Sequence, residues 1–150
     1  MELSIDVLKH LAAHKQTRWW DREAGGQLFA ILDQPSLVRI VDISGPRPTD
    51  RRSRNNYEPD RAAEKREIKE RYAIGRHFVG DWHTHRQCVP HPSGTDEHSI
   101  QELVRNSSHD LAGFFLVIVG QAEFPNGLYL AFHGVLGKAV LAPEPSGAGL

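Results

Sequence analysis

The chain has 150 residues, of which 39 % are hydrophobic and 25 % are charged, and its formal net charge at pH 7 is −1. This composition is typical of an ordinary soluble globular domain, and it excludes disordered and fibrous proteins. The near-zero charge offers no general attraction for nucleic acid or for an acidic membrane. The N-terminus lacks a signal-peptide pattern, and the longest apolar run, residues 114–119, is too short to cross a bilayer. A single cysteine, Cys88, fits a reducing compartment, so we expect a cytoplasmic protein without nucleic-acid or membrane partners.

The first part of the chain predicts a helix followed by a β-hairpin. Ser4 is placed to cap a helix over residues 4–14. The apolar residues that recur there at helical spacing are Ile5, Leu8, Leu11 and Ala12. Strands over 27–32 and 37–43 are predicted beyond a pair of tryptophans, Trp19 and Trp20. We interpret these tryptophans as core aromatics in preference to a wall that binds an extended peptide.

A long loop over residues 44–59 follows, rich in proline and carrying Arg51, Arg52 and Arg54. Loops of this length are commonly functional or mobile. The simplest interpretation of the three arginines is a solvated loop, and the alternative is a docking site for a modifier or a target protein.

Asp60 is the predicted N-cap of a helix over residues 61–72, a segment that is strongly helical by propensity. Its one narrow apolar seam would hold Ile68 and Tyr72, flanked by Ala62 and Ala63. We interpret this helix as a solvated surface stabilised by pairs of the Glu67–Arg71 type. The alternative is a docking surface for an acidic patch on a protein partner.

The second half predicts a short strand, a helix and a set of terminal strands. The strand covers residues 78–82 and the helix runs from Ser93 to about residue 106. The remaining strands are 112–119, which reads as buried on both faces, 128–133 and 135–141. The whole pattern predicts an α+β fold in which a mixed sheet is flanked by helices, forming one domain over residues 1–142. Residues 143–150 are predicted to be a frayed tail.

Three side chains after the 78–82 strand suit a metal site. His83 and His85 alternate along extended chain and therefore share a face. Asp96 would be fixed in the first turn of the next helix. Two imidazoles and a carboxylate are ligands that zinc accepts, and a catalytic zinc keeps one further position open. The alternatives are two polar residues on an open strand face and a simple capping box in which Ser93 accepts first-turn amides.

A zinc hydrolase also needs a general base, normally a carboxylate that is not a ligand. Glu23 is the candidate for this role. It precedes Gly25 and Gly26, where small residues allow a close backbone approach, and lies immediately ahead of a strand.

Taken together, Glu23, His83-x-His85 and Ser93-x-x-Asp96 resemble the full signature of the JAMM/MPN+ (JAB domain) zinc metallo-isopeptidases. The resemblance implies an MPN/JAB-type fold with a curved mixed sheet. It further implies that His83, His85 and Asp96 hold Zn²⁺, that Glu23 takes and returns the proton of the attacking water, and that Ser93 hydrogen-bonds the oxyanion.

The same resemblance implies the class of substrate. Family members cleave after the C-terminal glycine of ubiquitin or a ubiquitin-like protein, whose extended tail lies in a groove beside the metal. The candidate substrate-binding residues are Trp82, Arg51, Arg52 and Arg54. Arg86 stands where the family often has proline, so the charge of the rim is expected to differ. The chain also lacks the large insertions that grip a second ubiquitin.

The arginine-rich loop, Asn55-Asn56-Tyr57 and the run Gly80-Asp81-Trp82-His83-Thr84-His85 resemble the small bacterial isopeptidases of CBASS anti-phage operons. That resemblance implies a CD-NTase, a cGAS-like nucleotidyltransferase, conjugated to targets through its C-terminal tail. Two alternatives stay open: a peptidase that trims ubiquitin-like sulfur carriers, and a non-catalytic MPN-type scaffold. A cysteine-protease role for Cys88 is set aside, because it lies in a proline-bounded loop inside a complete zinc motif.

Overall fold

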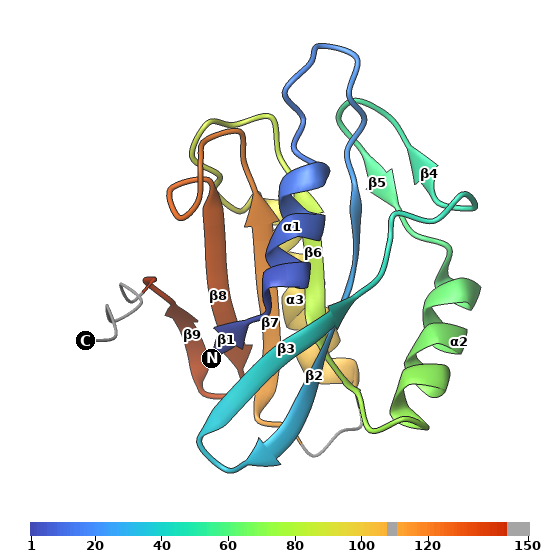
Figure 1. Cartoon of the computed structure of the whole chain (residues 1–150), viewed down its shortest axis with the longest axis vertical. Coiled ribbons are helices and arrows are strands. Elements are labelled where there is room, and N and C mark those ends of the chain that lie inside the picture. Colours follow the sequence, from blue (N-terminus) through green and yellow to red (C-terminus); the bar gives the residue numbers. More distant parts are fainter. Residues whose placement is uncertain (108–110, 144–150) are drawn as a thin grey trace.

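A seven-stranded mixed sheet with the strand order β1-β3-β2-β6-β7-β8-β9 forms the centre of the fold (Figure 1). We describe residues 1–107 and 111–143 of this computed structural model. The strands are β1 (Glu2–Leu3), β2 (Gly25–Gln34), β3 (Leu37–Ile43), β6 (His77–Thr84), β7 (Gly113–Val119), β8 (Leu128–Gly134) and β9 (Gly137–Val140). The β1–β3 and β6–β7 pairs are parallel, and the other neighbours in the sheet are antiparallel. The α+β prediction is confirmed.

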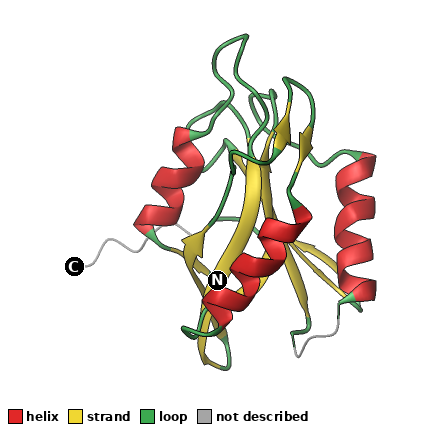
Figure 2. Ribbon diagram, turned by 90° about the vertical axis from the view of Figure 1, so that its right-hand side faces the viewer, coloured by secondary structure: helices red, strands yellow, loops and turns green. Residues whose placement is uncertain are grey.

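Helices cover both faces of this sheet (Figure 2). Helix α1 (Ile5–Ala13) contributes to a core cluster that contains Val117 and Val119, while α3 (Gly94–Asn106) contributes to a second cluster that contains Leu116 and Ile118. Because neighbouring residues of a strand point to opposite faces, β7 supplies both clusters and all its residues are buried. This confirms the strand predicted to be buried on both faces.

The bounds of α1 agree with the prediction within a residue at each end, but its buried face differs. Ile5 is 70 % exposed and Ala12 is exposed, whereas Val7 and Leu11 are almost fully buried. Val7 and Leu11 stand one helical turn apart. The helix therefore packs through a seam that is rotated relative to the predicted one.

Helix α2 (Arg61–Tyr72) begins as predicted, with the Asp60 carboxylate accepting from the backbone N–H groups of Ala62 and Ala63. The predicted apolar seam is wrong in part. Ala63 is buried as expected, but Tyr72 is 67 % exposed and the other buried residue is the charged Glu64.

Of the ion pairs predicted within α2, one forms between Arg61 and Glu64 at 2.8 Å, but the named pair of Glu67 and Arg71 does not. The Glu67 carboxylate accepts from Arg47, and Arg71 Nε donates to Asp42 of β3 at 2.9 Å. Tertiary partners have taken the place of the pair within the helix, so these charges anchor α2 to the sheet and to the loop after β3.

The 44–59 segment is more regular than a loop, because it contains the two-stranded hairpin β4 (Arg51–Arg52) and β5 (Tyr57–Glu58). Asp50 organises this segment. Its carboxylate accepts from the backbone N–H of Arg47 at 2.7 Å, from the Tyr57 hydroxyl at 3.1 Å and from the backbone N–H of Asp60 at 2.8 Å. These bonds fix the hairpin between β3 and α2.

Two further expectations concern the ends of the chain and membranes. The predicted frayed tail falls, apart from Pro143, outside the described residues. Within residues 1–107 and 111–143, no helix has the length and apolar character that crossing a membrane requires.

Candidate metal centre

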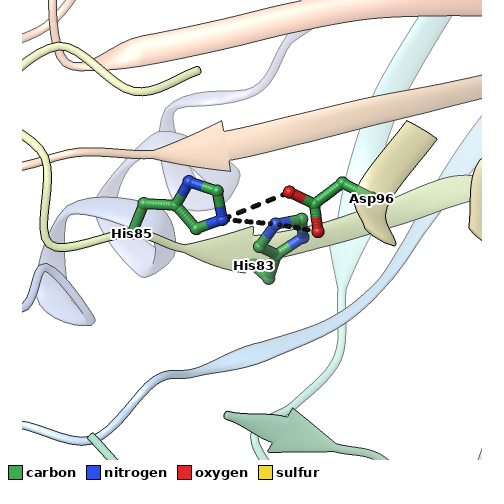
Figure 3. A group of neighbouring side chains, drawn as sticks. All are labelled: His83, His85 and Asp96. Carbon is green, nitrogen blue, oxygen red and sulfur yellow. Dashed lines mark hydrogen bonds and ion pairs between the residues drawn. The ribbon is translucent and has the colours of Figure 1, made fainter. Parts of the chain in front are cut away.

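His83, His85 and Asp96 converge in space, although the carboxylate comes from a different element (Figure 3). His83 lies near the end of β6, His85 directly follows that strand, and Asp96 lies in the first turn of α3. His83 Nε2 is 3.1 Å from Asp96 Oδ1, and His85 Nε2 is 3.3 Å from Asp96 Oδ2. The two Nε2 atoms are 3.2 Å apart. The three residues therefore form a compact triangle in which each imidazole approaches a different oxygen of the same carboxylate, and one ligand atom from each residue lies within 4.8 Å of the others.

This triangle is compact enough to hold one metal ion. Ligand atoms that each lie about 2.0–2.1 Å from a tetrahedrally coordinated zinc are roughly 3.3 Å from one another. The 3.2 Å between the two imidazole Nε2 atoms agrees with that value, and each of these nitrogens also lies 3.1–3.3 Å from one oxygen of Asp96. The three side chains are 15–16 % exposed, so one side of the triangle remains open to solvent. The donor set and its spacing fit a metal with a free coordination position.

The two histidines share a face because one residue, Thr84, separates them. Thr84 points the other way and is fully buried. Its hydroxyl donates to Gln16 Oε1 at 2.9 Å and accepts from the backbone N–H of Ala24 at 3.0 Å. Ala24, the residue after Glu23, is thereby hydrogen-bonded directly to β6, the strand that carries His83.

Glu23 lines the same cavity as His83, His85, Ser93 and Asp96, a space of about 400 Å³. The backbone of Glu23 is fixed from the hairpin side, because its N–H donates to Ser53 O at 2.8 Å and its carbonyl accepts from Arg52 Nε at 2.6 Å. The Glu23 carboxyl group is close enough to His83, His85 and Asp96 for their charges to act on it.

The glycines after Glu23 allow this approach. A Cβ built on Gly26 would lie 1.8 Å from Ser44 O, and one on Gly25 would lie 2.5 Å from the Tyr57 ring. Both distances are far below van der Waals contact. The expected close approach of backbones at Gly25 and Gly26 is confirmed.

The charges in the cavity shift one another's pKa values. Burial opposes the charged form of Asp96, but hydrogen bonds with His83 and His85 outweigh it and hold the pKa of Asp96 well below its usual range. The hydrogen bond with Asp96 also raises the pKa of His85. Burial raises the pKa of Glu23, against the opposing effect of the two imidazoles. A carboxylate with a raised pKa is a better proton acceptor.

Ser93 and Asp96 form the capping box that the sequence predicts. The Ser93 hydroxyl accepts from the Asp96 backbone N–H at 3.2 Å and donates to Asp96 Oδ2 at 2.8 Å. Ser93 also lines the cavity. The hydroxyl therefore lies where a ligand in the cavity could reach it, while in this structure it donates a hydrogen bond to Asp96.

Gln87 is a residue of the site that the sequence prediction missed. Its side-chain Oε1 accepts from His85 Nδ1 at 3.3 Å and from the backbone N–H of His91 at 2.8 Å. A histidine that binds a metal commonly donates its other ring N–H to an oxygen in this way, which fixes its tautomer. A search for an acceptor near His85 would have found this residue.

The candidate substrate-binding residues are dispersed. Arg52 supports the Glu23 backbone, as described above. Arg51 is largely exposed and lies 3.5 Å from Glu58. Arg54 is exposed on the hairpin, where its guanidinium lies over the Trp19 ring. The Trp82 side chain is 1 % exposed and belongs to the core, with its indole Nε1 donating to Ser44 O at 2.9 Å.

The interpretation of the first two tryptophans as core aromatics is wrong. Trp19 is 68 % exposed and Trp20 is 54 % exposed. They follow α1 in a segment that turns at the molecular surface, so hydrophobic character alone did not place them.

Comparison with known proteins identifies the family. The profile of the prokaryotic homologs of the JAB domain matches residues 4–129, and the chain therefore belongs to this family of JAB-domain proteins. It is 31 % identical over 121 residues to a "CD-NTase/cGAS isopeptidase" of Vibrio cholerae, covering 79 % of this chain and 74 % of that relative. It is 29 % identical over 94 residues to "Probable metalloprotease y4qB" of Sinorhizobium fredii, covering 60 % of this chain and 57 % of that relative.

Solved structures support the fold. The solution structure of a protein from Desulfitobacterium hafniense matches with a TM-score of 0.64 at 17 % identity, over 93 % of this chain and 88 % of that chain. A protein from Salinibacter ruber matches with a TM-score of 0.56 at 19 % identity, over 97 % and 94 %. The predicted JAB/MPN family, and its likeness to CD-NTase isopeptidases, are confirmed.

Proposed function

We propose that the protein is a zinc-dependent isopeptidase that cleaves after the C-terminal residue of a protein modifier. The observation that carries this proposal is the triangle of His83, His85 and Asp96 with Glu23 in the same cavity. A scaffold that only binds partners has no need for three converging ligands and a separate carboxylate. The catalytic reading therefore accounts for more of the site.

His83, His85 and Asp96 are the residues that would hold the ion. Bound zinc would supply Lewis acidity and would lower the pKa of the attacking water towards neutrality. Glu23 accepts the proton of the attacking water and returns it to the leaving amine, as a general base and then a general acid. The Ser93 hydroxyl donates a hydrogen bond to the oxyanion of the tetrahedral intermediate. To do so, it gives up its hydrogen bond to Asp96.

The proposed substrate is a CD-NTase conjugated through its C-terminal tail to a target, within a bacterial anti-phage system in the cytoplasm. Three relatives carry the name CD-NTase/cGAS isopeptidase, at 26–31 % identity. The cavity beside the candidate ligands has the volume to take a few residues of an extended tail. A ubiquitin-like sulfur carrier is the second candidate. We further propose that residues 1–142 act as one catalytic domain.

Cleavage of defined fusions tests this function. Purified, zinc-loaded protein is incubated with a CD-NTase joined at its C-terminus to a reporter, and with a sulfur-carrier fusion of the same design. We expect a cut at the CD-NTase junction, located by mass spectrometry, and no cut by the Glu23→Gln variant. Cleavage of the sulfur-carrier fusion alone would refute the CD-NTase assignment and favour a ubiquitin-like sulfur carrier as the substrate. If the zinc-loaded protein binds both fusions but cuts neither, the isopeptidase function is refuted and the non-catalytic scaffold is favoured.

A further inference from the structure

The segment between α1 and β2 presents two neighbouring indoles to solvent. Trp19 and Trp20 are 68 % and 54 % exposed, and their rings meet edge to face with centroids 5.6 Å apart. Tryptophan carries a large apolar area, so leaving two of them in water forgoes much hydrophobic stabilisation. Exposed apolar patches of this kind mark interaction surfaces.

Arginines flank both indoles. The Arg18 guanidinium lies 5.4 Å from the centroid of Trp20, and that of Arg54 lies 5.6 Å from the centroid of Trp19. Asp21 pairs with Arg18, but the side chain of Asp21 is only 14 % exposed while that of Arg18 is 65 % exposed. The charge offered to a partner is therefore positive. We name these four residues, Arg18, Trp19, Trp20 and Arg54, the Trp–Arg surface.

The Trp–Arg surface is held in place by the chain beneath it. Gln16 is fully buried, and its side-chain Nε2 donates to Arg54 O at 3.1 Å and to Asp21 O at 3.3 Å. The backbone N–H of Arg18 donates to Asp21 Oδ2 at 2.7 Å. The segment after α1 and the hairpin that carries Arg54 are therefore already bound to one another. A partner would lose little affinity in ordering them.

Arg86 connects this surface to the candidate metal centre. Its Nη2 donates to the carbonyls of Arg18 at 2.8 Å and Trp19 at 2.6 Å. Arg86 directly follows His85, and Arg54 directly precedes Asn55, which lines the cavity. The Trp–Arg surface therefore stands at the edge of the site. The arginine in place of the family's frequent proline has a structural role, because it fastens the tryptophan segment to the histidine strand.

We propose that the Trp–Arg surface docks the folded body of the protein whose C-terminal tail enters the site, and that this body offers an acidic and apolar patch. The proposal rests on the proposed function for the identity of that protein. Tryptophan and arginine are the residues most enriched where interfaces gain their binding energy. Positive charge at the rim selects an acidic partner and speeds the encounter. Arg86 acts as a positioning residue.

A comparison of two substrates isolates docking from chemistry. One is the full CD-NTase fusion, and the other is a short peptide that carries only its C-terminal residues before the same reporter. For the Trp19→Ser/Trp20→Ser double variant, we expect KM for the full fusion to rise at least about tenfold, with kcat and cleavage of the short peptide unchanged. Arg86→Ala should show the same split between KM and kcat. Tyr72→Ser is the matched control, since Tyr72 is 67 % exposed on α2.

Binding gives a readout that does not depend on turnover. The Glu23→Gln protein, with and without the double tryptophan substitution, is titrated with unconjugated CD-NTase, and loss of affinity on substitution supports the docking surface even if no fusion is cleaved. Equal affinity and equal KM for the double variant would overturn the docking proposal while leaving the proposed function intact. Arginine and tryptophan also suit single-stranded nucleic acid. Tryptophan-dependent binding of a labelled oligonucleotide, with unchanged cleavage of the full fusion, would likewise overturn it.

Discussion

Ser93 and Asp96 exchange hydrogen bonds across the first turn of α3. The backbone N–H of Ser93 donates to Asp96 Oδ2 at 2.7 Å, and the backbone N–H of Asp96 donates to Ser93 Oγ at 3.2 Å. Asp96 Oδ1 remains free to face His83. One carboxylate thus starts a helix and completes the candidate ligand set, which means that the direction of the carboxylate is fixed by secondary structure.

Metal content is the first prediction. We expect about one zinc per chain in protein purified without chelators, and less than about a tenth of that in His85→Ala, measured by mass spectrometry of the metal. Gln87→Leu should lower zinc affinity by about 10- to 100-fold, because His85 loses the acceptor that orients its ring. Cys88→Ser is the control, since this exposed thiol lies outside the ligand triangle. Zinc content that follows Cys88 and not His85 would refute the ligand assignment.

Removal of the candidate base should separate metal binding from turnover. Glu23→Gln preserves the size of the side chain but cannot accept a proton, and general acid–base groups contribute about 10²- to 10⁴-fold to rate. We expect a loss in kcat of that size with zinc content and melting temperature unchanged. An active Glu23→Gln enzyme would exclude Glu23 as the base.

Substitutions at Ser93 should distinguish the cap from the oxyanion donor. Glycine is nearly as good an N-cap as serine, whereas alanine costs about 0.5–2 kcal/mol of stability. Ser93→Gly should therefore unfold close to the wild type in urea but lose about 10²- to 10³-fold in kcat, the usual effect of one oxyanion donor. Ser93→Thr keeps the hydroxyl and should restore much of the rate. Full activity of the glycine variant would leave Ser93 with the capping role alone.

The close approach at Gly26 predicts a large stability effect. A Cβ in Gly26→Ala would lie 1.8 Å from the Ser44 carbonyl oxygen, so backbone must move. We expect the free energy of unfolding to fall by at least about 2 kcal/mol, within the range of strongly destabilising substitutions. At Gly94, a Cβ would meet nothing within 4 Å. Gly94→Ala is therefore the matched control, and it should be neutral or slightly stabilising because alanine favours the helix.

The pairing of Asp42 with Arg71 and Arg76 predicts a pH-dependent stability. Burial opposes the charged form of Asp42, but hydrogen bonds from Arg76 and Arg71 prevail and lower its pKa below the ordinary 3.8. The unfolded chain therefore binds the proton more readily, and the contribution is present above pH 3.8 and disappears as the pH falls through the folded-state value. Asp42→Asn should lower the urea midpoint at pH 7, and its difference from the wild type should shrink towards pH 3. A constant difference would show that charge is not involved.

The features that sequence reasoning predicted well depend on local patterns. The alternation of His83 and His85, the cap at Ser93 and the apolar run of β7 each follow from the period of a helix or strand. The family signature then joined Glu23 to this group across a long stretch of chain. The fold class and the candidate base and ligand residues were therefore accessible from the sequence, whereas Gln87, which contacts His85, was not.

The features that were missed depend on contacts between distant segments. The exposed position of Trp19 differs from what its hydrophobic character predicts, because the segment is held at the surface by hydrogen bonds from Gln16 to Asp21 O and from Arg86 to Trp19 O. Arg52 was grouped with the loop arginines, although it supports the Glu23 carbonyl. No periodicity within one element contains this information. A buried polar side chain such as Gln16 becomes informative only when its partners are visible.

The single residue between His83 and His85 makes the length of β6 critical. His83 lies opposite Gly25 of β2 and Ile118 of β7, so the strand is held in register on both sides. A one-residue insertion or deletion within β6 would exchange its two faces, placing Thr84 in the cavity and an imidazole in the core. Such a variant would lose one of the two imidazoles from the candidate ligand set even though every residue of the site was still present in its sequence.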